Sequence, residues 1–183
     1  MKKTIIVFAI IFALLLGGCT TQTREHTAQT WEHTVDLPPS RPDDFAIYYE
    51  WGYSSNNYLD TFNGKISKDL ITAGKAEGEI KVSEEMLDWI YSALKRYDIA
   101  SIPVEVNSEN CAAPWEGTVY MTPCAHYIIR FCADGKEYAV RGDATGEGYP
   151  QSEDFFDFVF FMTVLVESTP EYQAFPDAVG GYC

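Results

Sequence analysis

The sequence predicts an α+β fold: an antiparallel sheet of about five to seven strands with two main helices packed on one face. Strict alternation of apolar and polar residues over 45–53 is typical of a half-buried strand. The dipeptides Asn63-Gly64 and Asp134-Gly135 each separate two strand-like segments, as hairpin turns do. Two further segments, 83–97 and 152–167, have the length and the start signals of helices.

The strands follow from alternation and from the turns between them. The segments predicted as strands are 45–53, 59–62, 65–71, 79–82, 127–132 and 137–142. Asn63-Gly64 accepts positive φ at both central positions of a tight turn, so it predicts a hairpin. In the second hairpin, Tyr127, Ile129 and Phe131 face the same way, and Tyr138 and Val140 can meet them across the pair.

The helices are predicted from caps and from helical spacing. Ser83 can cap the first helix, and its apolar stripe is Met86, Leu87, Ile90, Leu94 and Tyr97. We interpret that stripe as core against the sheet. The second helix, 152–167, is apolar nearly all round and must be covered on more than one side, beside the first helix or in a dimer contact. Its Phe and Val content leaves a strand as the alternative, and Pro170 ends it.

Composition indicates one domain with a substantial core and excludes some partners. The chain has 183 residues, of which 46% are hydrophobic and 15% aromatic. Residues 44–183, about 140 in number, suit a single domain. The formal charge is −14. Binding to a phosphate backbone needs clustered Lys and Arg, so we expect no nucleic-acid partner. A basic protein partner is compatible with this charge but not required by it.

The first nineteen residues have the layout of an export signal. Lys2 and Lys3 precede an apolar run over 5–16, which is too short to span a bilayer. The ending Leu16-Gly17-Gly18-Cys19 resembles a bacterial lipobox. The resemblance implies cleavage between Gly18 and Cys19, acylation of the Cys19 thiol, and attachment to the cell membrane on its extracytoplasmic face. Whether that is the inner or the outer membrane of the bacterial envelope stays open.

The segment from 19 to 43 connects this signal to the folded domain. It is polar, rich in Thr and Gln, and lacks any apolar period before its final prolines. We therefore expect a lipidated cysteine followed by a flexible tether. An ordinary secretory signal with an incidental cysteine, or a retained membrane-spanning anchor, would be the alternatives. The acidic domain disfavours electrostatic adhesion to anionic lipid, so attachment is expected to depend on the acyl chains.

Four cysteines follow the lipidated one: Cys111, Cys124, Cys132 and Cys183. An even number in an exported protein suggests disulfides, and four cysteines allow three full pairings. Cys111 and Cys124 flank a proline-containing loop and are the preferred pair, which leaves Cys132 and Cys183. Two bridges, one bridge and free thiols all stay open. No Cys-x-x-Cys is present, so no metal site is predicted.

Two residues are candidates for a binding site. Trp115 lies in an irregular loop, which is where binding residues often occur, and His126 is the only histidine of the folded part. Pairing His126 with a cysteine would make a nucleophilic site, but disulfide bonding would remove that thiol. No hydrolase, zinc-protease or nucleotide-binding motif is present, and no cofactor is predicted.

The C-terminal motifs carry a second resemblance. The segment 167–172, together with Phe175-Pro176 and Gly180-Gly181-Tyr182, resembles the end of a group of uncharacterised bacterial lipoproteins, and Trp51-Gly52-Tyr53 and the two turns fit it. The resemblance implies an extracytoplasmic lipoprotein and names no chemistry.

Three functions are consistent with these observations. The leading hypothesis is a non-enzymatic, membrane-anchored module that binds a protein, a peptide or an envelope component. The first alternative is an inhibitor of a basic hydrolase such as lysozyme, because charge complementarity speeds encounter. The second alternative is a hydrolase that uses carboxylates the sequence does not single out. The oligomeric state stays open.

Overall fold

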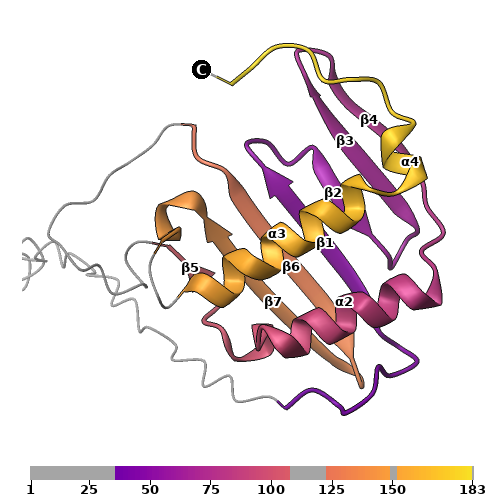
Figure 1. Ribbon diagram of the computed structural model, residues 1–183, viewed down its shortest axis with the longest axis vertical. Helices are drawn as coiled ribbons and strands as arrows, with labels where there is room; N and C mark the ends of the chain where they lie inside the picture. The colour runs from indigo at the N-terminus through magenta and orange to yellow at the C-terminus, as the bar shows by residue number, and fades with distance from the viewer. Residues whose placement is uncertain (1–35, 108–122, 149–151, 183) are drawn as a thin grey trace, which may run out of the picture. The chain divides into compact units, whose positions relative to one another are not determined.

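A computed structural model describes residues 36–107, 123–148 and 152–182. These residues form a seven-stranded sheet in the order β4-β3-β2-β1-β6-β7-β5, and helices α2 and α3 lie across one face of it (Figure 1). The strands are β1 (Ala46–Gly52), β2 (Asn57–Asp60), β3 (Lys65–Ile71), β4 (Gly74–Glu79), β5 (Glu105–Val106), β6 (His126–Ala133) and β7 (Lys136–Asp143). The predicted α+β architecture is confirmed.

The sheet is antiparallel except at one edge. Strand β1 is central and pairs with β2 on one side and with β6 on the other. The two-residue strand β5 runs parallel to β7, so the sheet is mixed, whereas the sequence predicted an antiparallel one. A parallel neighbour needs a long connection, and the chain from β5 to β7 includes β6, which pairs with β7 on its other side.

The alternation in β1 separates a core face from an open face. Ile47, Tyr49 and Trp51 are buried beneath the helices, as the period-two pattern predicts. The Tyr49 hydroxyl donates to the backbone oxygen of Val159 at 3.0 Å. This bond satisfies a phenol that would otherwise be buried without a partner. It also fixes α3 over the centre of the sheet.

The second hairpin turn is confirmed, and the first differs from its prediction. Asp134 and Gly135 adopt φ of 54° and 69°, as a two-residue turn of this hand requires. In the first hairpin only Gly64 has positive φ, and the loop covers residues 61–64. The Asp60 carboxylate accepts from the backbone and the side-chain amide of Asn63, at 3.2 and 2.7 Å, and thereby stabilises the longer loop.

The predicted strand at 79–82 is wrong. The strand lies at 74–79 instead, as the edge strand β4, and it pairs with β3 through a turn in which Ile71 and Gly74 have positive φ. Its sequence is charged and glycine-rich, so it carries no apolar alternation. Charged residues are common on edge strands because they discourage pairing with other chains.

The first helix, α2 (Glu84–Arg96), begins where the sequence predicts. The Ser83 side chain accepts from the Met86 backbone at 3.1 Å, and Met86, Ile90 and Leu94 are buried against the sheet. Residues 36–42, which the sequence assigned to the tether, lie against this helix. Arg41 pairs with Glu84 and Asp88 at 2.5 and 2.7 Å. The folded part therefore begins before residue 44.

The second helix, α3 (Glu153–Glu167), is confirmed as a helix. Its sheet-facing residues are buried: Phe155, Phe158, Val159, Met162 and Val166. Phe160 and Val164 point outward, and the Phe160 side chain is 73% exposed. Thr169 caps the short helix α4 (Pro170–Gln173), in agreement with the predicted stop at Pro170.

The C-terminal segment is attached beside β3 through a buried carboxylate. The Asp69 side chain, only 6% exposed, accepts hydrogen bonds from Ser54, Asn56, the Ile71 backbone and the Tyr182 hydroxyl. Burial raises the pKa of Asp69, but these hydrogen bonds outweigh it and hold the pKa below its ordinary value. The carboxylate thus links the segment that follows β1, strand β3 and the end of the chain.

This carboxylate predicts a loss of stability in acid. Because its folded-state pKa is lowered, its contribution is fully present above the unfolded pKa of about 3.9 and is lost as the pH falls through the folded value. We expect Asp69→Asn to lower the free energy of unfolding at pH 7 by about 1–3 kcal/mol, and to flatten its decrease below pH 4. Urea unfolding between pH 2.5 and 7 measures both quantities. The exposed Asp177 gives the matched control, Asp177→Asn; equal effects of the two substitutions would contradict the assignment.

Candidate functional site

The sheet face opposite the helices, the open face, carries the candidate site. Strand register places on it the side chains of six of the seven strands, all but β5. Those of interest here are polar or aromatic, apart from the small Ala139: Tyr48, Glu50, Tyr58, Ser67, Glu77, His126, Arg130, Glu137 and Ala139. In the part of the chain that the structure describes, neither α2 nor α3 lies over this face (Figure 1). The open face is therefore the candidate binding surface of the domain.

The centre of the open face is a stack of two tyrosine rings and a guanidinium group. The Tyr48 and Tyr58 rings stack with centroids 5.9 Å apart. The Arg130 guanidinium lies 4.6 Å from the centroid of the Tyr48 ring. The Arg130 side chain is exposed, and its guanidinium makes no hydrogen bond or ion pair with any residue that the structure describes. The ring thus holds the guanidinium in place while leaving its N–H donors available.

A chain of hydrogen bonds lies beside this stack. The Tyr48 hydroxyl donates to Glu50 Oε2 at 2.5 Å, and Glu50 Oε1 lies 3.2 Å from His126 Nε2. Burial, followed by the bond to Glu50, raises the pKa of Tyr48, so the phenol stays protonated. Burial and then the bond to Glu77 likewise raise the pKa of Tyr58 to about 12. Both carboxylate oxygens of the buried Glu50 therefore have a hydrogen-bond partner, and these hydrogen bonds fix the orientation of Tyr48.

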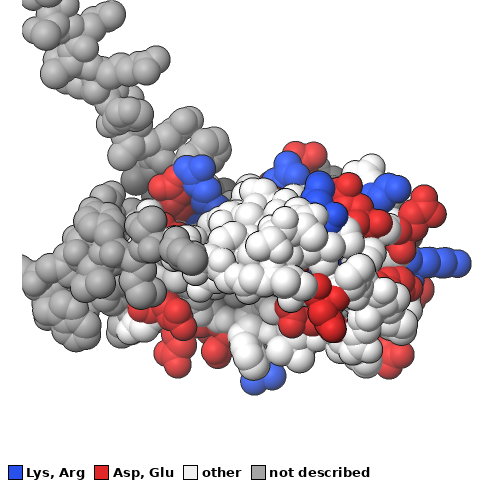
Figure 2. All heavy atoms as spheres, turned by 90° about the horizontal axis from the view of Figure 1, so that it is seen from above, with Lys and Arg blue, Asp and Glu red and all other residues white. Residues whose placement is uncertain are grey.

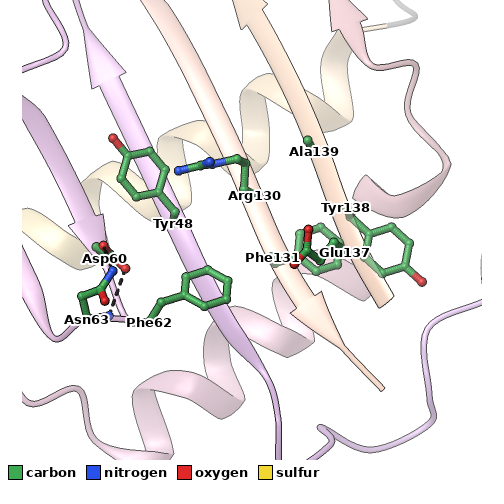
Figure 3. Close-up of a pocket in the computed structure, with 9 residues that line it drawn as sticks. All are labelled: Tyr48, Asp60, Phe62, Asn63, Arg130, Phe131, Glu137, Tyr138 and Ala139. Atoms are coloured by element: carbon green, nitrogen blue, oxygen red, sulfur yellow. Dashed lines mark hydrogen bonds between the residues drawn. The ribbon is translucent and has the colours of Figure 1, made fainter. Parts of the chain in front are cut away.

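A hollow of about 460 Å³ opens next to the stack, and we call it the Arg130 hollow (Figure 3). Side chains from β1, β6, β7 and the β2–β3 loop line it, among them Tyr48, Phe62, Asn63, Arg130, Glu137 and Ala139. Figure 3 shows the guanidinium directed toward Tyr48 and the Phe62 ring reaching from the loop into the same space. Ala139 pairs with Arg130 across the strands, and its small side chain leaves room there.

A second, smaller hollow of about 320 Å³ lies at the edge of the sheet formed by β5, β7 and β6. It is lined in part by Glu105, His126, Ile128, Arg141 and Gly142. Arg141 and Glu105 form an ion pair there. Because this guanidinium already has a carboxylate partner, the second hollow offers less unsatisfied hydrogen-bonding capacity than the first.

The structure places only some of the sequence-predicted site residues. His126 lies on the open face, where its contact is with Glu50 and not with a cysteine. Trp115, Gly18, Cys19, Cys111 and Cys183 lie outside the described residues. Their predicted roles stay predictions.

Cys124 and Cys132 are free thiols in the structure. They lie at opposite ends of the extended segment around β6, and eight extended residues span about 26 Å, so these two cannot be bonded to each other. That excludes one of the three pairings that the sequence left open. Partial burial and then the Asp44 carboxylate raise the pKa of the Cys132 thiol, which disfavours a reactive thiolate.

The sequence did not single out Arg130, Tyr48 or Phe62. The alternation in 45–53 does place Tyr48 opposite the core residues, but it says nothing of what lies beside Tyr48. Only the register of β1 with β6, which sets Tyr48 opposite Arg130, brings the pair together. A strand partner 82 positions along the chain cannot be read from local pattern.

The described residues, 36–107, 123–148 and 152–182, contain neither a metal-binding cluster nor a membrane-spanning helix. Within these ranges, no group of three or more His, Cys, Asp or Glu side chains is arranged to hold a metal ion. None of the helices described there combines the length and apolar character needed to cross a bilayer.

No protein-family model matches the chain, and no curated protein matches it.

Proposed function

We propose that the protein is a lipid-anchored, extracytoplasmic binding module, without catalytic activity, that engages a component of the bacterial envelope through its open sheet face. The anchoring part comes from the signal and lipobox at residues 1–19. The binding part comes from the Arg130 hollow.

The observation that carries the proposal is the state of Arg130. A guanidinium that is exposed, unpaired among the described residues and held against a ring is arranged to meet a partner. Holding the side chain in advance lowers the conformational entropy lost on binding. The adjacent hollow, with one exposed aromatic ring from Phe62, provides the concave surface that small ligands or ligand side groups need.

The geometry supports the two alternatives less well. An inhibitor of a basic hydrolase would present free carboxylates, yet the open face pairs Lys65 with Glu79 and Lys75 with Glu77. Figure 2 likewise shows basic and acidic side chains interspersed along the upper rim of the domain. For a hydrolase, two carboxylates near the hollow are already engaged, Glu50 by Tyr48 and His126 and Asp60 by Asn63. Glu137 is then left without the second carboxylate that acid–base hydrolysis uses.

The anchor gives the first test. We expect the wild-type chain, expressed in a bacterium, to lose residues 1–18 and to partition into detergent. Cys19→Ala should abolish that partition, because it removes the thiol that carries the two or three acyl chains. No acyl chain is then left to hold the protein in the membrane. Mass spectrometry of the N-terminal peptide and detergent phase separation measure the outcome. A Cys19→Ala protein that is processed and membrane-bound as before would contradict the lipid anchor.

The open face gives the second test. We expect purified full-length protein to sediment with isolated, delipidated envelope material, and Arg130→Gln to reduce the bound fraction about tenfold, a loss of one charged hydrogen-bonding group. The matched control is Arg96→Gln, since Arg96 also lies over a tyrosine ring, Tyr97 at 5.4 Å, but on α2. Sedimentation that both variants retain in full would contradict a site at Arg130.

A further inference from the structure

The chemistry that lines the Arg130 hollow restricts what it can bind. Its polar side chains, from Asp60, Asn63, Arg130 and Glu137, all end in planar groups that make directed hydrogen bonds. Among the described residues, Glu137 makes no ion pair and Arg130 makes none either. The hollow therefore presents a free acceptor and a free donor to the same ligand.

The charges in the hollow disfavour a strongly charged ligand. One guanidinium faces two carboxylates, from Asp60 and Glu137. A polyanion would meet both carboxylates, and a polycation would meet Arg130, so each would suffer repulsion from part of the lining. Hydroxyl groups avoid this conflict, because each one can accept from a guanidinium and donate to a carboxylate.

The aromatic rings differ in what they leave exposed. One face of Tyr48 is taken by Tyr58 and the other by Arg130, so this ring positions the guanidinium and offers little free surface. Phe62 is 49% exposed and belongs to the lining of the hollow. It is the surface on which a flat apolar face of a ligand can pack.

These features together describe a neutral saccharide. A pyranose ring has an apolar C–H face for Phe62 and a rim of hydroxyl groups for Arg130 and Glu137. The cavity volume, about 460 Å³, lies within the range of roughly 300–1,000 Å³ for small-molecule sites. We propose that the Arg130 hollow binds an uncharged oligosaccharide, with one sugar ring against Phe62 and its hydroxyl groups on Arg130 and Glu137. This inference rests on the proposed function and names the class of its ligand.

Isothermal titration of the full-length protein in detergent tests the ligand class. The neutral probes are fully N-acetylated chitotetraose and maltotetraose, and the charged probes are tetragalacturonate and the glucosamine tetramer that lacks the acetyl groups. We expect at least one neutral probe to bind with a Kd on the order of 1 mM or lower and both charged probes to bind at least tenfold more weakly. Absence of binding by both neutral probes, or tighter binding of a charged one, would overturn the inference.

Three substitutions locate the site. Phe62→Ala removes the stacking surface, Arg130→Gln removes the donor, and Ala139→Leu fills the hollow from an exposed position on β7. Each should raise the Kd of the neutral probe at least tenfold. The circular dichroism spectrum and the midpoint of thermal unfolding should stay as in wild type, and Arg96→Gln should leave the Kd unchanged. Equal binding by wild type and all three variants would place the saccharide elsewhere and refute the site.

The two proposals fail in different ways. If the envelope material retains the protein through Arg130 while no neutral saccharide binds, the ligand class is wrong and the binding module stands. If the protein binds neither the envelope material nor a neutral saccharide, the proposed function and the inferred ligand class both fail.

Discussion

Replacing Phe158 by alanine should lower the free energy of unfolding by about 3–5 kcal/mol. Phe158 is fully buried in α3, between the sheet and α2, and Tyr97 packs edge-on against its ring at 6.4 Å. The substitution removes the transfer free energy of the ring and leaves a cavity that neighbours on three elements cannot close. Urea unfolding followed by circular dichroism measures the change.

The matched control is Phe160, which lies two residues further along the same helix and so about half a turn away. Phe160 is 73% exposed, so Phe160→Ala should change the free energy of unfolding by less than about 0.5 kcal/mol. Both substitutions remove the same atoms from a helix interior, and the helix propensity of alanine favours each of them equally. Equal destabilisation by the two would contradict the placement of α3 on the sheet.

Gly142→Ala should lower the free energy of unfolding by about 1–3 kcal/mol. A Cβ at this position in β7 would come within 2.5 Å of Phe155 Cε1 and 3.0 Å of the Val106 backbone oxygen. Phe155 is fully buried, so its ring has no free space to move into. Relief would require β7 or α3 to shift, which disturbs the pairing of β7 with β5.

Gly181→Ala is the control for this steric argument. Gly181 has no atom within 4 Å of its would-be Cβ and no positive φ, so the substitution should leave the midpoint of urea unfolding unchanged. A Gly142→Ala protein as stable as wild type would mean that α3 does not pack against this part of the sheet.

Local pattern was sufficient for much of the fold. The alternation in β1, the Ser83 cap of α2 and the Asp134-Gly135 turn each depend on residues close together in the chain, and each is found as predicted. The two edge strands could not be predicted from local pattern. Strand β4 has charged and glycine residues in place of an apolar face, and β5 has only two residues, so neither carries a periodic signal.

The candidate site could be predicted only in part. His126 could be predicted because it is the one histidine of the folded part. Its partner Glu50 could not, because nothing in the sequence distinguishes a buried carboxylate from the other acidic residues, 27 in all. The Arg130 hollow depends on strand register and on the small side chain of Ala139. These are tertiary properties, and the sequence has no local pattern that encodes them.

The central claim is that the open face, not the outer face of the helices, meets the envelope. Its most direct test is a photo-crosslinking phenylalanine analogue placed at Phe62 or at Phe160, which are both exposed but lie on the two different faces. We expect, in intact cells, a crosslinked product from position 62 that Arg130→Gln reduces, and none from position 160. Crosslinking from position 160 with none from position 62 would contradict it.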